Sequence, residues 1–227
     1  FIVMNKILNM FFHWMDVFYN KYYPMTIINR IRSRKRNKNK NFSLLVGNCL
    51  GGYVYHQLGL KFNSPTINLM IHDDDFFKIV SKPSYYLSQE ITPFVDPDYP
   101  NVPSGKIDDV IIHFTHYKTV EEGEEYWNKR KKRINWDNLY IIAADMRLSE
   151  EQIKAYANVK CKKLVVFTSK KYNYPYCLHV KRFNGQPHVG TYIGKTCMGK
   201  WEFEHFFDYV GWLNSDDPIA QHFSLEK

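Results

Sequence analysis

The sequence predicts an α/β protein with a three-layer, mainly parallel sheet, helices on both faces, and a C-terminal hairpin and helix. Two observations predict this class. Short apolar runs alternate with helical segments from residue 41 onward, and the runs have the continuous apolar character of strands buried on both faces. A chain of 227 residues is long enough for one such domain with an appendage.

The strands of this sheet are predicted from apolar runs that end at polar or glycine-containing loops. They are Phe42 to Val46, Thr66 to Ile71, Asp109 to Thr115, Leu139 to Ala143, and Leu164 to Phe167, with a minor strand at Ile91 to Val95. Helices are expected between them, from Gly51 to about Leu58, Phe76 to Val80, Tyr85 to Gln89, Val120 to Arg133, and Glu150 to Asn158. The helix that starts after Thr119 has a capping box with Glu122.

The rhythm changes after Tyr176. Two apolar stretches, Cys177 to Phe183 and Val189 to Ile193, flank the turn residues Asn184 and Gly185, which predicts a hairpin. A last helix is expected from about Glu202 to Leu213. The domain boundaries are therefore 1–41 for an N-terminal helix and basic linker, and 42–227 for a single α/β domain.

The N-terminal segment combines an apolar stripe with concentrated positive charge. Apolar residues recur at helical spacing between Ile7 and Phe18, and seven basic residues without an acid fall within residues 30–40. This order suits a helix lying on an anionic membrane surface, at the inner face of the membrane. The alternative is that the stripe packs on the domain or on a second subunit, forming a homo-oligomer, and that the basic run is a solvated linker.

The charge of the remaining chain argues against a nucleic-acid-binding protein. The formal net charge is +8, but the basic run accounts for seven of these charges, and no basic recognition helix or RNP-like aromatic motif is present. We therefore expect no nucleic-acid partner. The four cysteines form no C-x-x-C pair and no zinc-site spacing, which favours a reducing cytoplasm and no metal site.

Polar residues follow the predicted strands and, in a parallel sheet, would share the edge where ligands bind. They are Asn48 and Cys49, His72 to Asp75, His116 and Tyr117, Asp145, and Thr168 and Ser169. Asp73 to Asp75 are read either as a metal-binding D-x-D motif or, with preference, as the capping first turn of a helix. His113 is expected to be a satisfied core histidine.

Cys49, His116 and Asp145 are the candidate catalytic residues. Cys49 at a helix start is a candidate nucleophile, and a helix dipole would stabilise its thiolate. His56 lies two helical turns away, too far for direct proton transfer, so His116 from a neighbouring loop is the better base. The alternative is that Cys49 is a small apolar residue in a buried turn.

Asn48, Gly51, Gly52, Arg130 and Arg133 are the candidate substrate-binding or phosphate-binding residues. Glycines at a helix start let backbone N–H groups approach an anion, although neither a dinucleotide-binding nor a P-loop motif is present. The alternative is that they permit a tight turn and close helix packing. Arg130 falls on the core side of its helix and is expected to meet a structural carboxylate or a substrate phosphate. The sequence identifies no cofactor.

Several separate blocks resemble the bacterial domain-of-unknown-function family nineteen-nineteen. The matching stretches lie between residues 42 and 214; they are 48–55, 64–66, 112–117, 127–135, Asn138 and 212–214. Members of this family often accompany exopolysaccharide or capsule biosynthesis, and the family brings no established catalytic residues. The resemblance therefore implies a carbohydrate-polymer pathway and no inherited residue role.

Taken together, we expect a cytoplasmic α/β protein of surface-polysaccharide biosynthesis, peripheral to the membrane in one reading. Its function would be a transferase of glycosyl or acyl type that acts on a sugar, nucleotide-sugar or phosphate-activated substrate. The rival hypothesis is a non-catalytic binding or assembly protein of the same pathway, whose working surface is the N-terminal helix.

Overall fold

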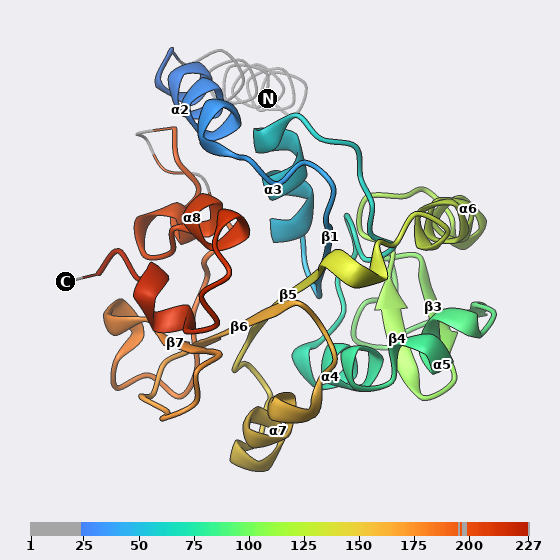
Figure 1. The fold of residues 1–227 in the computed structure, drawn as a ribbon. Coiled ribbons are helices and arrows are strands. Elements are labelled where there is room, and N and C mark those ends of the chain that lie inside the picture. Colours follow the sequence, from blue (N-terminus) through green and yellow to red (C-terminus); the bar gives the residue numbers. More distant parts are fainter. Residues whose placement is uncertain (1–23, 195, 197–198, 227) are drawn as a thin grey trace, which may run out of the picture.

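The computed structural model describes residues 24–194, 196 and 199–226. Its central sheet has four parallel strands in the order β1 (Ser43–Val46), β5 (Leu139–Ala144), β6 (Lys163–Thr168) and β7 (Cys177–His179), as Figure 1 shows. The runs predicted at Phe42, Leu139 and Leu164 are confirmed as strands of this sheet. Residues 1–23 of the apolar N-terminal stretch predicted above lie outside the described residues.

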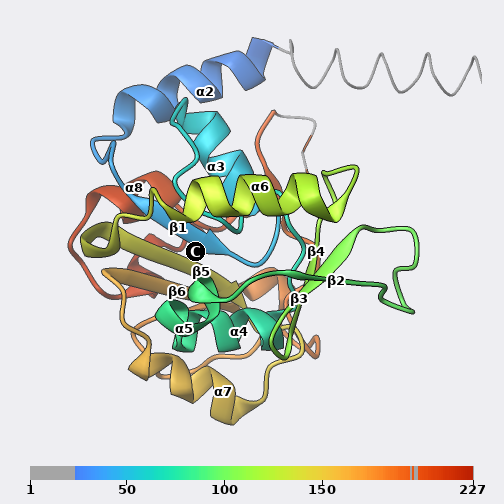
Figure 2. The same ribbon diagram turned by 90° about the vertical axis from the view of Figure 1, so that its right-hand side faces the viewer.

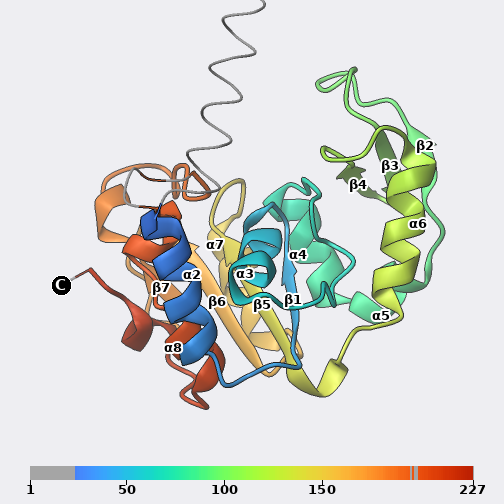
Figure 3. The same cartoon turned by 90° about the horizontal axis from the view of Figure 1, so that it is seen from above.

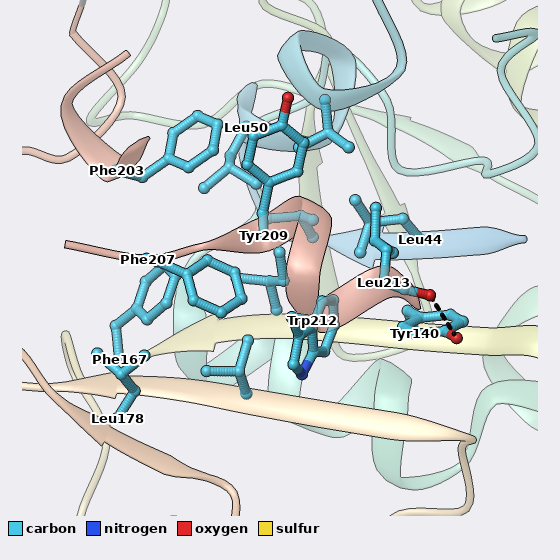
Figure 4. Close-up of a cluster of buried hydrophobic side chains, with 14 of the residues drawn as sticks. Leu44, Leu50, Tyr140, Phe167, Leu178, Phe203, Phe207, Tyr209, Trp212 and Leu213 are labelled. Atoms are coloured by element: carbon cyan, nitrogen blue, oxygen red, sulfur yellow. Dashed lines mark hydrogen bonds between the residues drawn. The ribbon is translucent and has the colours of Figure 1, made fainter. Parts of the chain in front are cut away.

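Helices cover both faces of this sheet, so the three-layer α/β class is confirmed. Successive strand residues point to opposite faces, and Leu44 and Leu45 accordingly belong to two separate buried clusters. One face carries α3 (Leu50–Leu58) and α8 (Tyr209–Asn214); the other carries α4 (Asp73–Ser81) and α7 (Glu150–Ala155), on opposite sides of the sheet in Figure 2. Figure 4 shows the first cluster, where Trp212 packs edge-on against Tyr140, with ring centroids 5.1 Å apart.

A second, antiparallel sheet stands beside the first (Figure 3). It consists of β2 (Thr92–Phe94), β3 (Ser104–Ile107) and β4 (Val110–His113). The minor strand at Ile91 to Val95 is thus confirmed as an edge strand, but the placement of Asp109 to Thr115 in the parallel sheet was wrong. A tight turn with Asp108 at φ 54° pairs this run with β3 instead, since an Asp tolerates positive φ.

Thr66 to Ile71, predicted as a strand, is a turn followed by a single bridge. Asn68 adopts φ 62°, and only Met70 pairs, in antiparallel fashion, with His113. Ile67 and Leu69 are buried although this run joins no sheet. Ile67 lies against Gly51 of α3, and its carbonyl accepts from Arg130, a residue of α6 (Val120–Lys131). Buried apolar residues alone do not distinguish these two arrangements.

The predicted C-terminal hairpin is also wrong. Cys177–His179 pairs in parallel with β6, and residues 189–193 form no strand. Val189 is held by a bond from its N–H to the Asp145 carboxylate (2.6 Å), which takes the place of a ladder bond. The last helix begins at Tyr209, later than predicted, because the Asp208 side chain caps it by accepting from Gly211 N; a 3₁₀ turn, Glu202–His205, precedes it.

The remaining helices agree with the sequence pattern. Thr119 caps α6 (Val120–Lys131) by accepting from the N–H of Glu122. Gly123 allows α6 to approach the ring of Phe114, just beyond β4. The others are α5 (Pro83–Ser88) and 3₁₀ turns at Trp136–Asn138, Tyr156–Asn158, Lys181–Phe183 and Ala220–Phe223.

The first described helix, α2 (Pro24–Arg36), lies across α3 at the outer surface of the molecule (Figure 1). An asparagine cluster, Asn39, Asn138 and Asn214, anchors the chain that follows it. Asn39 Nδ2 donates to the Leu213 carbonyl (3.2 Å) and to Tyr140 Oη (3.1 Å), while its Oδ1 accepts from Asn138 Nδ2 (3.0 Å). The domain boundary at residue 41 stays a prediction, but residues 24–40 are in close contact with the α/β body.

We predict that Asn39→Ala lowers the free energy of unfolding by about 1–3 kcal/mol, because it leaves buried polar partners unsatisfied. Chemical denaturation measures this. Asn101→Ala, at an exposed loop position, is the control and should have little effect. Equal stability of the two variants would contradict an anchoring role for the asparagine cluster.

We also predict that Gly123→Ala destabilises the protein by about 1–3 kcal/mol, although alanine is the better helix former. A Cβ at this position would lie 2.1 Å from Phe114 Cδ1, so α6 or the buried ring must shift. Thermal unfolding should show the loss, with Glu125→Ala on the exposed side of α6 as control. An unchanged melting temperature would mean that α6 does not pack closely on Phe114.

Candidate active site

The Met70–Ile71 segment joins the two sheets where their functional loops begin. Ile71 N donates to the Gly47 carbonyl at the end of β1 (2.7 Å). Met70 and His113, at the end of β4, exchange two backbone hydrogen bonds of 2.9 Å. The chain continues from Gly47 to Cys49 and from His113 to His116, so both side chains emerge beside this bridge.

Cys49 and His116 meet there. Cys49 Sγ lies 3.2 Å from His116 Nε2, within reach for proton transfer between a nucleophile and its base. Cys49 immediately precedes α3 and is half-buried, whereas His116 is on an exposed loop. The structure therefore brings together the nucleophile and the base that the sequence suggested.

Burial raises the pKa of the Cys49 thiol. This direction is opposite to the thiolate stabilisation expected from the start of a helix. The thiol is thus the resting form at neutral pH, and it needs a base to become a nucleophile. His116 is placed to be that base.

Gly51 and Gly52 lie in the first turn of α3. A Cβ on Gly51 would be 3.0 Å from Ile67 Cδ1, and one on Gly52 would be 2.6 Å from Asn68 Oδ1, so the pair allows α3 to pack tightly on the turn at 66–69. Their N–H groups precede the first helical hydrogen bond, from Tyr53 N to the Cys49 carbonyl. First-turn N–H groups are available to an anion, and a phosphate contact there stays a prediction.

Arg130 and Arg133 clamp the segment that packs on α3. Arg130 Nη1 donates to the Ile67 carbonyl (2.9 Å) and to Tyr117 Oη (2.8 Å), and Arg133 Nη1 donates to the Phe62 carbonyl (3.1 Å). Among the described residues neither arginine forms an ion pair with a carboxylate. Arg130 is buried, and through Tyr117 it supports the loop that carries His116.

Asp145 follows β5 and its carboxylate holds two loops. Oδ2 accepts from the N–H and the hydroxyl of Ser169 (2.7 and 3.0 Å), and Oδ1 accepts from Val189 N. The hydrogen bonds of this buried carboxylate therefore go to Ser169 and Val189, and among the described residues none goes to the ring of His116. Its catalytic role stays a prediction.

A cleft of about 300 Å³ opens beyond the carboxyl ends of β1 and β5. Its walls come from the loops after β1 and β5, the start of α4 and residues 190–193. Asn48 lines it and donates to Tyr192 Oη (2.7 Å). Cys49 follows Asn48 in the sequence, but neither Cys49 nor His116 lines the cleft. The expectation of a shared edge is confirmed for the loops that do line it.

The acidic run at the start of α4 borders this cleft. Asp73, Asp74 and Asp75 form the first turn of α4, as the preferred alternative predicted. Burial raises the pKa of Asp73 well above its usual range, with further raising by Asp145 and Asp74, which favours the neutral acid. No group of three potential metal-ligating side chains occurs in the part of the chain that the structure describes.

His113 is a core histidine, as predicted, with partners on both ring nitrogens. Nε2 lies 2.8 Å from Asp96 Oδ2, and Nδ1 lies 3.1 Å from the Met70 carbonyl. The hydrogen bond from His113 lowers the pKa of Asp96. Sequence reasoning missed Asp96; its Asp-Pro-Asp context indicates the turn in which Asp96 Oδ1 accepts from Asp98 N.

Tyr53 and Trp201 were missed as well. Their rings stack with centroids 3.7 Å apart. Burial raises the pKa of Tyr53, and Cys49 raises it further, because the two residues lie one helical turn apart. The four-residue spacing was a usable signal for Tyr53, but nothing local indicates that Trp201 covers it.

Comparisons with known proteins match this sequence to a protein family and to a relative. The family described as "Domain of unknown function (DUF1919)" matches residues 19–214, a span that also includes the basic run. A protein of Haemophilus influenzae described as "Uncharacterized protein" is 33% identical over 189 residues, covering 82% of this chain and 90% of its own. No helix among residues 24–194, 196 and 199–226 is long and apolar enough to cross a membrane.

We predict that the rate of Cys49 alkylation by iodoacetamide reaches half of its maximum at a higher pH than the rate for an unburied thiol such as N-acetylcysteine. The thiolate is the reactive form, and a raised pKa means that its fraction still increases where an ordinary thiol has levelled off. Peptide mass spectrometry measures this and should find Cys49 faster than Cys177, whose burial raises its pKa to about 12. A rate for Cys49 that is flat from about pH 6 upward would instead indicate a preformed thiolate.

Proposed function

Since this chain belongs to the DUF1919 family, whose function is unknown, we propose from its site geometry that it is a cysteine-dependent acyltransferase. The carrying observation is the 3.2 Å separation of Cys49 Sγ and His116 Nε2. A thiol paired with an imidazole is suited to forming a covalent acyl intermediate. Of the two transferase types considered, the acyl type fits this pair, because a cysteine thiol activated by a histidine forms covalent acyl intermediates.

The first half-reaction acylates the enzyme. His116 Nε2 takes the thiol proton as Cys49 Sγ attacks the carbonyl carbon of an acyl thioester donor. The tetrahedral intermediate then expels the donor thiolate, which receives the proton from His116. The backbone N–H groups of Gly51 and Gly52 are the candidate donors to the oxyanion, in place of the phosphate expected from sequence.

The second half-reaction releases the acyl group to an acceptor hydroxyl. His116 removes the hydroxyl proton, the alkoxide oxygen attacks the Cys49 thioester, and the thiolate leaves and is reprotonated by His116. The products are an ester and the original thiol. The resemblance to proteins that accompany exopolysaccharide or capsule biosynthesis supports a sugar hydroxyl as the acceptor, and the cleft beside Asn48 is the proposed place for that sugar.

The rival function is a non-catalytic binding or assembly protein. The apolar side chains exposed on α2, Met25, Ile27, Ile28 and Ile31, favour an interaction surface of this kind. In that case Cys49 would be an ordinary half-buried thiol that forms no acyl adduct. The two functions therefore differ in one measurable product.

We predict that an acetyl thioester or p-nitrophenyl acetate leaves one acetyl group on the Cys49 peptide. Cys49→Ala should abolish this adduct, and His116→Ala should slow its formation at pH 7 by about 10²–10⁴-fold, the usual contribution of a positioned base. Quenched-flow mass spectrometry measures both rates.

Cys161→Ala and His222→Ala serve as matched controls, because neither residue contacts the Cys49–His116 pair. Both should acylate like the parent. A folded protein that forms no adduct with either donor, or an adduct that persists in Cys49→Ala, would contradict the proposal and leave the binding function.

A further inference from the structure

The helix α2 turns its polar side inward and its apolar side outward. Thr26 and Asn29 are only 2% and 9% exposed, whereas Ile28 and Ile31 are 40% and 48% exposed. Ile27 and Met25 are also exposed. A surface helix normally buries its apolar face, so this orientation needs an explanation outside the α/β body.

Specific contacts determine this orientation. The backbone of Gly199 approaches Thr26 so closely that a Cβ on the glycine would lie 2.7 Å from Thr26 N. Arg34 Nε donates to the Gln57 carbonyl on α3 (3.2 Å), and Arg36 pairs with Asp208 at the start of α8. The helix cannot rotate its isoleucines inward without breaking these contacts.

Cations extend the same exposed face. Arg32 lies four residues after Ile28, and Lys35 lies four residues after Ile31, so each is the helical neighbour of an exposed isoleucine. Both are exposed, and among the described residues neither has a carboxylate within ion-pair distance. The sequence of α2, PMTIINRIRSRKR, contains no acid.

We propose that this face of α2, formed by Met25, Ile27, Ile28, Ile31, Arg32 and Lys35, docks on the surface of an anionic lipid membrane. Isoleucine and methionine side chains enter the boundary between headgroups and acyl chains, and the adjacent cations meet the lipid phosphates and carboxylates. The proposal is independent of the acyl transfer at Cys49.

Charge disfavours a second copy of the chain as the occupant. In a two-fold interface the same patch faces itself, so Arg32 and Lys35 of one copy would approach those of the other, with no acid on either helix. An anionic lipid surface instead supplies opposite charge and an apolar layer together.

The test is co-sedimentation of the full chain with vesicles of phosphatidylcholine containing phosphatidylserine, compared with phosphatidylcholine alone. We expect the affinity for anionic vesicles to be at least about tenfold higher and to fall as salt is added. Ile28→Asp/Ile31→Asp and Arg32→Glu/Lys35→Glu should each lower it by at least about tenfold.

Two control variants change the same chemistry elsewhere. Val95→Asp alters an apolar residue that is 73% exposed on another surface, and Lys129→Glu/Lys132→Glu reverses two exposed cations on and just after α6. Both should bind like the parent, and circular dichroism should show all variants folded.

Three results would overturn the proposal. The parent chain does not sediment with anionic vesicles, or the α2 variants sediment as it does, or the Val95→Asp and Lys129→Glu/Lys132→Glu controls lose binding as much as the α2 variants do. Since residues 1–23 are unchanged in every variant, binding that resides there would leave the α2 variants unaffected. A dimer in analytical ultracentrifugation that Ile28→Asp/Ile31→Asp dissociates, without vesicle binding, would assign the face to a second copy.

Discussion

The Met70–Ile71 segment is the constraint on which the candidate active site depends. It hydrogen-bonds on one side to Gly47, at the end of the first parallel strand, and on the other to His113, at the end of an antiparallel strand. Cys49 and His116, the candidate nucleophile and base, are thereby held 3.2 Å apart although the loops that carry them follow strands of different sheets. Arg130 supports the preceding turn, residues 66–69, through the Ile67 carbonyl. The distance between Cys49 and His116 therefore depends on how firmly the two sheets are held together. Buried, hydrogen-bonded groups such as Arg130 and His113 hold them.

The polar groups around the site differ in their partners. Asp145, Arg130 and His113 have their polar atoms engaged by neighbouring loops and strands. Cys49 and His116 contact each other at the surface of the site. Buried polar groups generally need such partners, so their residue types alone do not reveal a chemical role. The contacts show which of these groups are engaged by the fold and which face one another.

The sequence predicted the parts of the fold that local pattern determines. β1, β5 and β6 are continuous apolar runs, and α6 and α7 begin at recognisable caps. Thr66 to Ile71 has the same local pattern as a strand, but its partners are Gly47, His113 and Arg130, all distant in sequence. The Cys49–His116 pair was anticipated from a rule about parallel sheets, although His116 follows an antiparallel strand. Arg130 was expected to meet an anion, but its hydrogen-bond partners are the Ile67 carbonyl and the Tyr117 hydroxyl. The sequence could not identify these partners, because tertiary packing brings them to Arg130.

The pairing of β1 with β5 has a consequence for the newly made chain. Ser43 aligns with Leu139, so β1 leaves the ribosome 96 residues before its partner strand begins. At ordinary rates of translation this delay lasts about 5–20 s, and all four residues of β1 are buried in the finished protein. Until β5 is synthesised, this strand exposes apolar side chains and unpaired backbone groups. Chaperone capture of nascent chains that end before residue 139 is the expected result of this late strand pairing.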